Sequence, residues 1–201
     1  MAADDAPVLV PGTGYIYVAP PGTPLPDLSK PGFDPKDSTK WGPEGLTWKS
    51  IGNTSLDNGI EMSVDGDEPE VLGSWQQKSL KTTDPGKTYA VTINLSDFTA
   101  ESYRLYYGTD KGLDAKGLFS IPTSPAAQNR ALMVAAVDGT KAVVWHYPKT
   151  SIIGADSVTM DPATLGEMPV KATVVALNQS TPLGSVTPVF DLAAGLQAPA
   201  A

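Results

Sequence analysis

Side chains that could carry out chemistry are few in this 201-residue sequence. His146 is the only histidine, and on a strand it would lie on the face opposite Trp145 and Tyr147. A lone histidine with no nucleophile or second ligand beside it is typical of a polar surface residue, not of a general base or a metal ligand. Because the chain has no cysteine, disulfides, thiol catalysis and Cys-based zinc sites are excluded.

Two glycine patterns of known chemistry are absent or incomplete. The serine hydrolase pattern Gly-x-Ser-x-Gly does not occur. Gly12-Thr13-Gly14 lacks the third glycine of a dinucleotide-binding loop and precedes Tyr-Ile-Tyr instead of a helix start. It therefore predicts a turn before a strand. We predict that the chain is not an enzyme and has neither a catalytic residue nor a cofactor.

Acidic residues crowd together between Asp65 and Glu70. Hard cations such as Ca²⁺ need several oxygen ligands close together, which makes this cluster a candidate metal site. Pro69, however, stands where the EF-hand pattern needs its third ligand. We predict a solvated acidic turn and no metal site, with a weak cation site as the alternative.

The residues before this cluster alternate between apolar and polar. From Leu56 to Asp65 the pattern is that of one strand with two different faces. The apolar face is expected to be buried in the core, and it comprises Leu56, Ile60, Met62 and Val64. The opposite face is expected to be an acidic stripe that comprises Asp57, Glu61 and Asp65, with Ser63 between the last two.

Charge and composition limit the possible partners. A net charge of −8 opposes tight binding to nucleic acid, because such binding needs lysine and arginine to displace counterions from phosphates. The longest purely apolar run, residues 131–137, is far shorter than the roughly 20 residues that cross a bilayer. The first residues lack the basic start of a signal peptide. We expect a soluble, unexported chain with no membrane partner.

Apolar runs of period two predict a mainly β protein. They lie at residues 15–19, 89–95, 131–137, 142–147, 157–165 and 170–177. Asp138-Gly139, between two of these runs, predicts a tight hairpin. One helix is predicted after Phe98, because Thr99 can cap its start, Phe98 and Tyr103 can form a hydrophobic staple, and Gly108 can end it.

The segment at residues 20–45 predicts a long irregular loop. Eight prolines between residues 11 and 43, interleaved with glycines, prevent a continuous helix or a central strand. Loops longer than about 15 residues are usually functional or disordered. Leu25, Phe33 and Trp41 are candidate anchors, and we predict that they dock on something outside the loop. A flexible surface loop is the alternative.

Several short stretches together resemble the major tail tube proteins of long, non-contractile-tailed phages, particularly those that infect actinobacteria. In chain order they are Thr54-Ser-Leu-Asp-Asn-Gly59, Val64-Asp65-Gly66, Trp75, Thr82-Thr83, Ser151-Ile-Ile-Gly-Ala-Asp-Ser-Val158 and Asp161-Pro162. The resemblance covers about residues 48–177. None of the stretches is a catalytic motif, so its weight comes from several matches in the same order.

The resemblance implies a tail-tube-type β-sandwich or half-barrel with one flanking α-helix and a long N-terminal loop. Residues 1–177 would form the tube domain, with the loop at 20–45 included, and residues 178–201 a C-terminal extension. Such proteins form hexameric rings that stack around a tape measure protein into the tube that conducts DNA during ejection. The implied partners are further copies of the chain, the tape measure protein, and the tail terminator and distal tail proteins. The implied location is the tail of a virion made in the host cytoplasm.

In such a tube the lining needs few cations and no apolar patches that would hold DNA. We therefore predict that the acidic stripe of Asp57, Glu61 and Asp65 lines the lumen, where DNA passes without specific binding. Exposure of this stripe to the outer solvent is the alternative. The resemblance does not extend to residues 20–45, so the prediction for this loop comes from its length and its aromatic residues: Leu25, Phe33 and Trp41 would contact an adjacent subunit or ring. A different class of protein remains open, a monomeric β-sandwich binding or virion-decoration module. Its candidate stacking platforms are Trp41, Trp48, Trp75 and Tyr107.

Overall fold

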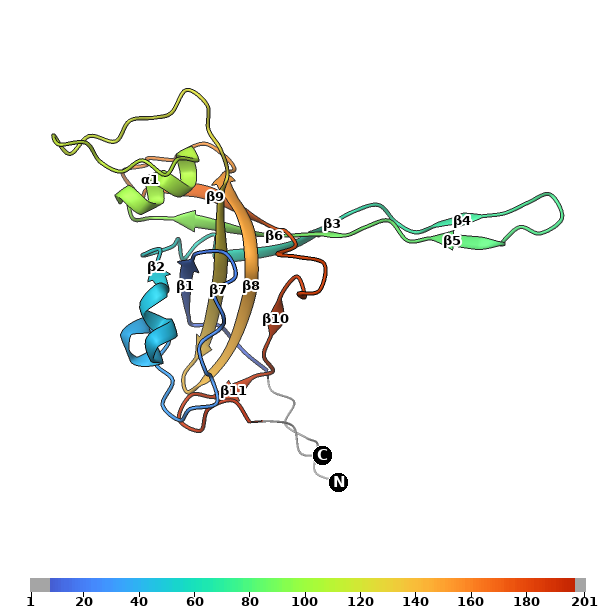
Figure 1. The fold of residues 1–201 in the computed structure, drawn as a ribbon, viewed down its shortest axis with the longest axis horizontal. Helices are drawn as coiled ribbons and strands as arrows, with labels where there is room; N and C mark the ends of the chain where they lie inside the picture. The colour runs from blue at the N-terminus through green and yellow to red at the C-terminus, as the bar shows by residue number, and fades with distance from the viewer. Residues whose placement is uncertain (1–7, 198–201) are drawn as a thin grey trace.

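The computed structural model describes residues 8–197, which fold around one large antiparallel sheet of nine strands (Figure 1). In chain order these strands are β1 (Thr13–Ala19), β2 (Lys49–Ser50), β3 (Ile60–Asp65), β6 (Thr88–Leu95), β7 (Gln128–Asp138), β8 (Lys141–Gly154), β9 (Met168–Val174), β10 (Ser185–Val186) and β11 (Phe190–Asp191). Across the sheet the order is β2-β1-β7-β8-β9-β6-β3, and β10 and β11 both pair with β8. Two further strands, β4 (Glu70–Leu72) and β5 (Lys81–Thr83), pair only with each other.

Five of the six period-two runs fall in strands, as predicted. They overlap β1, β6, β7, β8 and β9. The prediction of a strand at residues 157–165 is wrong, because this stretch is a loop with a single bridge between Thr159 and Glu167. The Asp161 carboxylate accepts a hydrogen bond from the Ala163 amide at 2.8 Å. Pro162 has no amide hydrogen to donate, so a turn replaces the ladder there.

The strands β7 and β8 form the centre of the sheet. They are joined at the predicted hairpin, where Gly139 has a φ of +58° and Asp138 pairs with Lys141. Between the pairs Leu132–Tyr147 and Arg130–Thr150, β8 contains one more residue than β7. This bulge exchanges the two faces of β8 and bends it towards β9, which pairs only with its last five residues.

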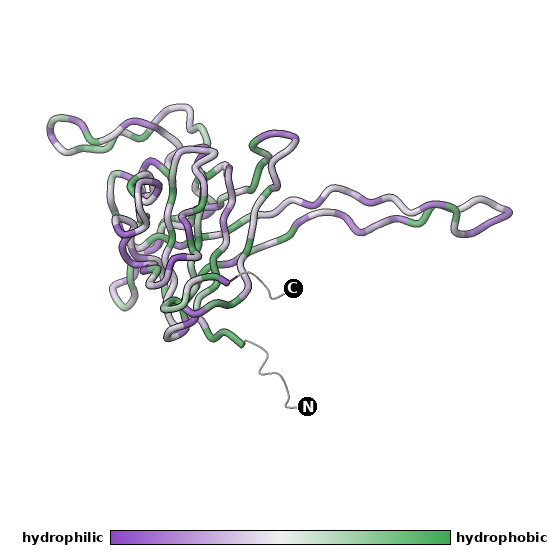
Figure 2. The backbone as a smooth tube through the Cα atoms, turned by 60° about the horizontal axis from the view of Figure 1, so that its bottom comes forward, coloured by the Kyte–Doolittle hydropathy of each residue, from purple (hydrophilic) through white to green (hydrophobic). Residues whose placement is uncertain are grey.

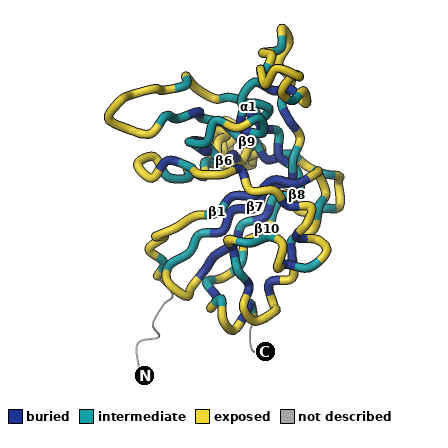
Figure 3. Tube along the Cα trace, turned by 90° about the vertical axis from the view of Figure 1, so that its left-hand side faces the viewer, coloured by how far each residue is buried: buried dark blue, intermediate teal, exposed yellow. Residues whose placement is uncertain are grey.

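One face of the sheet, here called the inner face, closes on itself. Its cluster of buried residues draws on β1, β6, β7, β8 and β9 together, so the sheet curls until the β6–β9 half covers the β1–β7 half. Members include Ile16, Val18, Val91, Ile93, Leu132, Val134, Ile152 and Val170. Figure 3 shows the buried segments concentrated along β7 and β8. The fold agrees with the β-sandwich or half-barrel that the resemblance implies.

The single helix α1 (Ala100–Tyr107) packs beside the inner cluster through Leu105, which is 1% exposed. Its ends follow the prediction. The Thr99 hydroxyl accepts a hydrogen bond from the Ser102 amide at 3.2 Å, and the rings of Phe98 and Tyr103 lie 6.4 Å apart. Gly108 ends the helix with a φ of +60°, a conformation that favours glycine. In the described part of the chain, no helix is long and apolar enough to cross a membrane.

The opposite, outer face of the sheet is covered over β1, β7 and β8 by residues 20–48. This cover includes two short 3₁₀ helices, η1 (Ser38–Trp41) and η2 (Pro43–Thr47). Trp41 stacks on Phe33 at 5.2 Å and contacts the edge of Tyr17 at 4.7 Å. Burial, with Asp34 and Asp37 nearby, raises the pKa of Tyr17 to about 12.

The loop anchors Phe33 and Trp41 dock outside the loop, as predicted, but on the sheet of their own chain. They are 7% and 5% exposed, and both belong to the outer cluster of their own chain. Leu25 packs partly against the same cluster. The physical reason is that the outer face of β1, β7 and β8 is apolar and needs a cover. Contact between the exposed side of this segment and an adjacent subunit stays a prediction.

The predicted C-terminal extension from residue 178 onward contributes to the sheet. Ser185 of β10 pairs with His146, and Phe190 of β11 pairs with Ala142. Phe190 is 7% exposed within the outer cluster. The Leu196 amide donates to the Leu28 carbonyl at 2.8 Å, which ties this part of the chain to the loop segment.

Candidate assembly interface

The three acidic residues predicted to share one strand face are divided between a turn and a strand. Glu61 and Asp65 do lie on the same face of β3. Asp57 lies in a turn at residues 56–58, where the Ser55 hydroxyl accepts a hydrogen bond from the Asn58 amide at 3.3 Å. The strand therefore begins only after this turn. All three carboxylates are exposed.

Glu61 and Asp65 belong to the uncovered half of the outer face. Thr92 of β6 lies opposite Glu61, and Lys171 of β9 lies opposite Thr92. The Lys171 ammonium is 3.6 Å from the Asp65 carboxylate. The outer face is thus apolar where residues 20–48 cover it and polar where β3, β6 and β9 leave it open.

The prediction that the apolar residues between Leu56 and Asp65 form a buried face is wrong for most of them. Leu56 is 88% exposed, Val64 58% and Met62 37%, whereas Ile60 packs against the inner cluster. β3 is the last strand of the sheet and runs away from the body, so its far end is little covered. The Tyr147 hydroxyl of β8 lies 4.0 Å from the Met62 sulfur. Three apolar side chains are left in solvent.

Beyond β3 the chain continues into a projecting hairpin, residues 66–87, here called the arm (Figure 1). The β4–β5 ladder holds its outer part together, and the Leu80 amide donates to the Leu72 carbonyl at 2.8 Å. All residues of the arm except Thr83 and Pro85 are exposed. Figure 2 shows apolar stretches along it, and the exposed large apolar side chains are Val71, Leu72, Trp75 and Leu80.

An apolar hollow, here called the root hollow, lies on the body beside the base of the arm. Its volume is ≈ 410 Å³. The lining side chains come from β6, β8, β9 and β10 and the residues before β10, and they are mainly Tyr89, Trp145, Tyr147, Val174, Leu183 and Val186. Burial raises the pKa of Tyr147. At physiological pH this hollow therefore presents aromatic and aliphatic groups without a charge in its lining.

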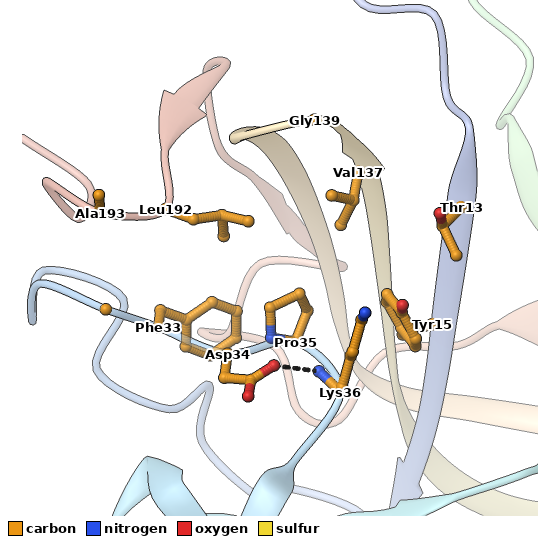
Figure 4. Close-up of a pocket in the computed structure, with 11 residues that line it drawn as sticks. Thr13, Tyr15, Phe33, Asp34, Pro35, Lys36, Val137, Gly139, Leu192 and Ala193 are labelled. Atoms are coloured by element: carbon orange, nitrogen blue, oxygen red, sulfur yellow. Dashed lines mark hydrogen bonds between the residues drawn. The ribbon is translucent and has the colours of Figure 1, made fainter.

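A second hollow of ≈ 440 Å³ lies between the loop segment and the β7–β8 hairpin (Figure 4). Phe33 and Pro35 form part of its wall, together with the charged residues Asp34 and Lys36. Hydrogen bonds from the Lys40 ammonium and the Lys36 amide lower the pKa of Asp34. This second hollow is therefore charged at neutral pH, unlike the root hollow.

Two features that could carry chemistry, a metal cluster and His146, can be checked in the described residues. No group of three or more histidine, cysteine or acidic residues is placed to hold a metal ion in residues 8–197. The prediction that His146 is a surface residue is wrong, since it is 8% exposed, lies against Trp48 and bonds to the Thr23 carbonyl at 3.1 Å. Burial lowers its pKa. Its role is to fill the outer face under the loop.

Comparison with known proteins decides between the two classes considered. The sequence profile of one family, described as "Phage tail tube protein", matches residues 1–187. The chain belongs to this family. It is 34% identical over 183 residues to "Major tail protein Gp23" of Mycobacterium phage L5, with 86% of this chain and 87% of the relative covered. It is 31% identical over 200 residues to "Major tail protein Gp23" of Mycobacterium phage D29, with 97% and 98% covered.

Membership of this family gives the chain a structural role in a tail tube, and the mainly β fold with one helix agrees with it. The alternative of a binding module with an aromatic platform loses most of its candidates. Trp41 and Trp48 are buried, and Tyr107 is packed against Tyr103 and Phe119. Of the proposed platform residues, only Trp75 is fully exposed, at 102%.

The arm is the feature that sequence reasoning missed. Two signals in the sequence indicate it. The apolar alternation of β3 ends at Gly66, and a period-two run resumes at Thr88 after a polar stretch that still contains Trp75. A lone tryptophan between polar residues, with no strand pattern to bury it, is unusual for a surface turn.

Proposed function

We propose that this chain is the repeating subunit of a phage tail tube, and that six copies form a ring and rings stack into the tube. The observation that carries the proposal is the pairing of family membership with an arm that projects apolar side chains out of the body. Monomeric proteins rarely expose contiguous apolar surface without a partner. The role is structural and not catalytic.

The open edge of the sheet favours contact between copies. β3 pairs with β6 on one side and has no partner on its other side among the described residues, and β2 at the far end has only two residues. Unpaired edges attract other strands. A head-to-tail contact that joins one edge region to the next subunit closes into a ring when the rotation fits.

We further propose that Asp57, Glu61 and Asp65 face the lumen. Glu61 and Asp65 lie on a broad, open, polar surface of β3, β6 and β9, which suits a wall past which DNA must move. Six copies would give a negative wall, weakened by Lys171, and at physiological salt its field would reach roughly 8 Å. DNA would be held off this wall and pass without specific binding.

The tube subunit also contacts other proteins of the tail. In the ring stack the lumen holds a tape measure protein before DNA enters, and the two ends of the tube meet tail terminator and distal tail proteins. Synthesis takes place in the host cytoplasm. The exposed side of the 20–48 segment faces an adjacent subunit or ring. Leu25 is half-buried against the outer cluster, so part of its side chain is open to that contact.

Electron microscopy tests the assembly. Purified protein at rising concentration, alone and with a tape measure fragment, is expected to give sixfold rings and tubes of uniform diameter. Class averages that show only single compact particles under every condition would overturn the proposal.

The lumen assignment has its own test. Virions that carry Glu61→Lys are expected to eject DNA more slowly than wild type, most clearly at low salt, where phosphate contacts are strongest. Glu44→Lys is the matched control, since Glu44 is also exposed and lies on η2, away from β3. Equal ejection rates for both variants at low salt would show that Glu61 does not face the lumen.

A further inference from the structure

Trp75 is the most exposed large apolar side chain in the described part of the protein. It is 102% exposed at the end of the arm, with Val71, Leu72 and Leu80 exposed close to it along the chain. Tryptophan, when buried at an interface, removes roughly 150–250 Å² of surface from water and is frequently a binding hot spot. A side chain of this kind in solvent indicates a binding partner.

The arm keeps Trp75 away from the body of its own chain. Strands β3 and β6 pair in register up to Asp65 and Thr88, and β4 and β5 continue the pairing further out. Trp75 lies ten positions beyond Asp65 in the chain, which at about 3.3 Å per residue corresponds to a reach of at most about 33 Å. Figure 1 shows the arm directed outward, so the partner of Trp75 belongs to another molecule.

The root hollow has the chemistry to receive an indole ring. Tyr89, Trp145 and Tyr147 supply aromatic walls, and Leu183 and Val186, at 40% and 59% exposed, stand open at the surface. Aromatic pairs contribute about 0.5–1.5 kcal/mol beyond the area that they bury. The hollow beside Phe33 is less suitable for an indole ring (Figure 4). Binding there would remove water from the charged groups of Asp34 and Lys36 without giving them a new polar partner.

We infer that the root hollow is the binding site for Trp75 of a second copy of this chain. The inference rests on the proposed tube assembly and deepens it, because it names the two surfaces that meet. The contact is heterologous: each copy inserts its own Trp75 into one neighbour and receives the Trp75 of another. Such a contact propagates through rings and stacks instead of ending at a dimer.

The small area of the contact explains why Trp75 binds the root hollow only within an assembly of several copies, and not as part of a free peptide. One tryptophan buries far less than the roughly 1,200 Å² that a stable protein interface needs. The remaining interface must come from other contacts between the same molecules, which raise the local concentration of the arm near the hollow. A free arm peptide would therefore bind the body only weakly.

Crosslinking in assembled tubes tests the contact, because the chain has no cysteine of its own. Gln76→Cys keeps Trp75 and places a thiol beside it, and Val186→Cys places one at the hollow. Tubes built from a mixture of these two variants are treated with a short bismaleimide. We expect a crosslinked dimer in the mixture and not in tubes of either variant alone.

In the matched control, the second cysteine is placed at another exposed apolar residue instead of at the hollow. Ile121 is 63% exposed in the long loop after α1, so Ile121→Cys is mixed with Gln76→Cys in the same way. Tubes that form but link Gln76→Cys to Ile121→Cys, or fail to link it to Val186→Cys, overturn this inference and leave the proposed function standing. Failure of the wild-type chain to form rings or tubes overturns both.

A second measurement uses the tryptophan itself. Trp75→Ala is expected to raise the protein concentration needed for tube formation on the order of tenfold or more, and Trp75→Phe is expected to recover part of that loss. Tube formation by Trp75→Ala at the wild-type concentration would contradict the inference.

Discussion

Tryptophan is buried in the body of the protein and exposed on the arm. In the body, Trp41 and Trp48 are 5% and 2% exposed, each with its indole nitrogen donating to a backbone carbonyl. On the arm, Trp75 is 102% exposed. The body closes its inner face by curling the sheet and its outer face with residues 20–48. The arm is a two-stranded ribbon whose residues, apart from Thr83 and Pro85, are exposed.

This difference separates the residues that hold the fold from those available for assembly. An isolated two-stranded hairpin is marginally stable in water, so the arm contributes little to the stability of a single chain. The body has a complete core without it. Substitutions in the body should therefore act on the free energy of unfolding, and substitutions in the arm should act on association.

The largest expected effect comes from truncating a body tryptophan. Trp41→Ala should lower the free energy of unfolding by about 3–5 kcal/mol, because a buried ring is replaced by a cavity next to Phe33 and Tyr17. Denaturant titration of the monomer measures this loss. Trp75→Ala is the matched control and should change it by less than about 0.5 kcal/mol. Similar losses for the two variants would remove the distinction between body and arm.

A smaller effect is expected from acidification of the body. Since burial lowers the pKa of His146 in the folded state, the unfolded chain takes up the proton first as the pH falls. The free energy of unfolding is therefore highest above about pH 6.5, the usual pKa of histidine in an unfolded chain. It decreases as the pH falls from there to the lower pKa of the folded state, by at most about 1.4 kcal/mol per pH unit. Unfolding of wild type and His146→Gln from pH 8 to pH 5 measures it.

The control variant makes the source of this pH dependence clear. His146→Gln cannot titrate in this range, so the difference in stability between the two proteins should shift in favour of the variant as the pH falls. A difference that stays constant between pH 8 and pH 5 would contradict the burial of a neutral histidine under the loop.

The smallest effect is expected at the exposed ion pair on the open face. Asp65→Asn removes its charge beside Lys171, where the two side chains are 63% and 43% exposed. Exposed pairs contribute only about 0–1 kcal/mol, so monomer stability should change by less than that. Denaturant titration at low and high salt checks this. A loss comparable with that of Trp41→Ala would mean that the face is part of the core.

Sequence reasoning worked where local rules decide the structure. The cap at Thr99, the helix end at Gly108 and the turn at Gly139 each depend on a few neighbouring residues. The central strands were predictable because their apolar residues alternate and are buried. Short sequence stretches shared with known tail proteins indicated the family. Composition and periodicity alone could not have indicated it.

Sequence reasoning failed where burial depends on parts far apart in the chain. Alternation on β3 was correct, but whether Val64 is covered depends on where the sheet ends. Trp41 and Trp75 look alike in sequence, and only the sheet face below residues 20–48 separates them. The surface position predicted for His146 is wrong because the loop that covers it, at Thr23, lies 123 residues away in the chain.

Replacing the arm tests most directly the claim that the body folds alone and that the arm serves assembly. Asp65 and Thr88 lie opposite each other, so residues 66–87 can be replaced by Asn-Gly, which closes a two-residue hairpin in the same register. We predict a folded chain whose melting temperature stays within about 4 °C of the wild type, and which forms no tubes by electron microscopy. Normal tubes, or an unfolded chain, would contradict the account.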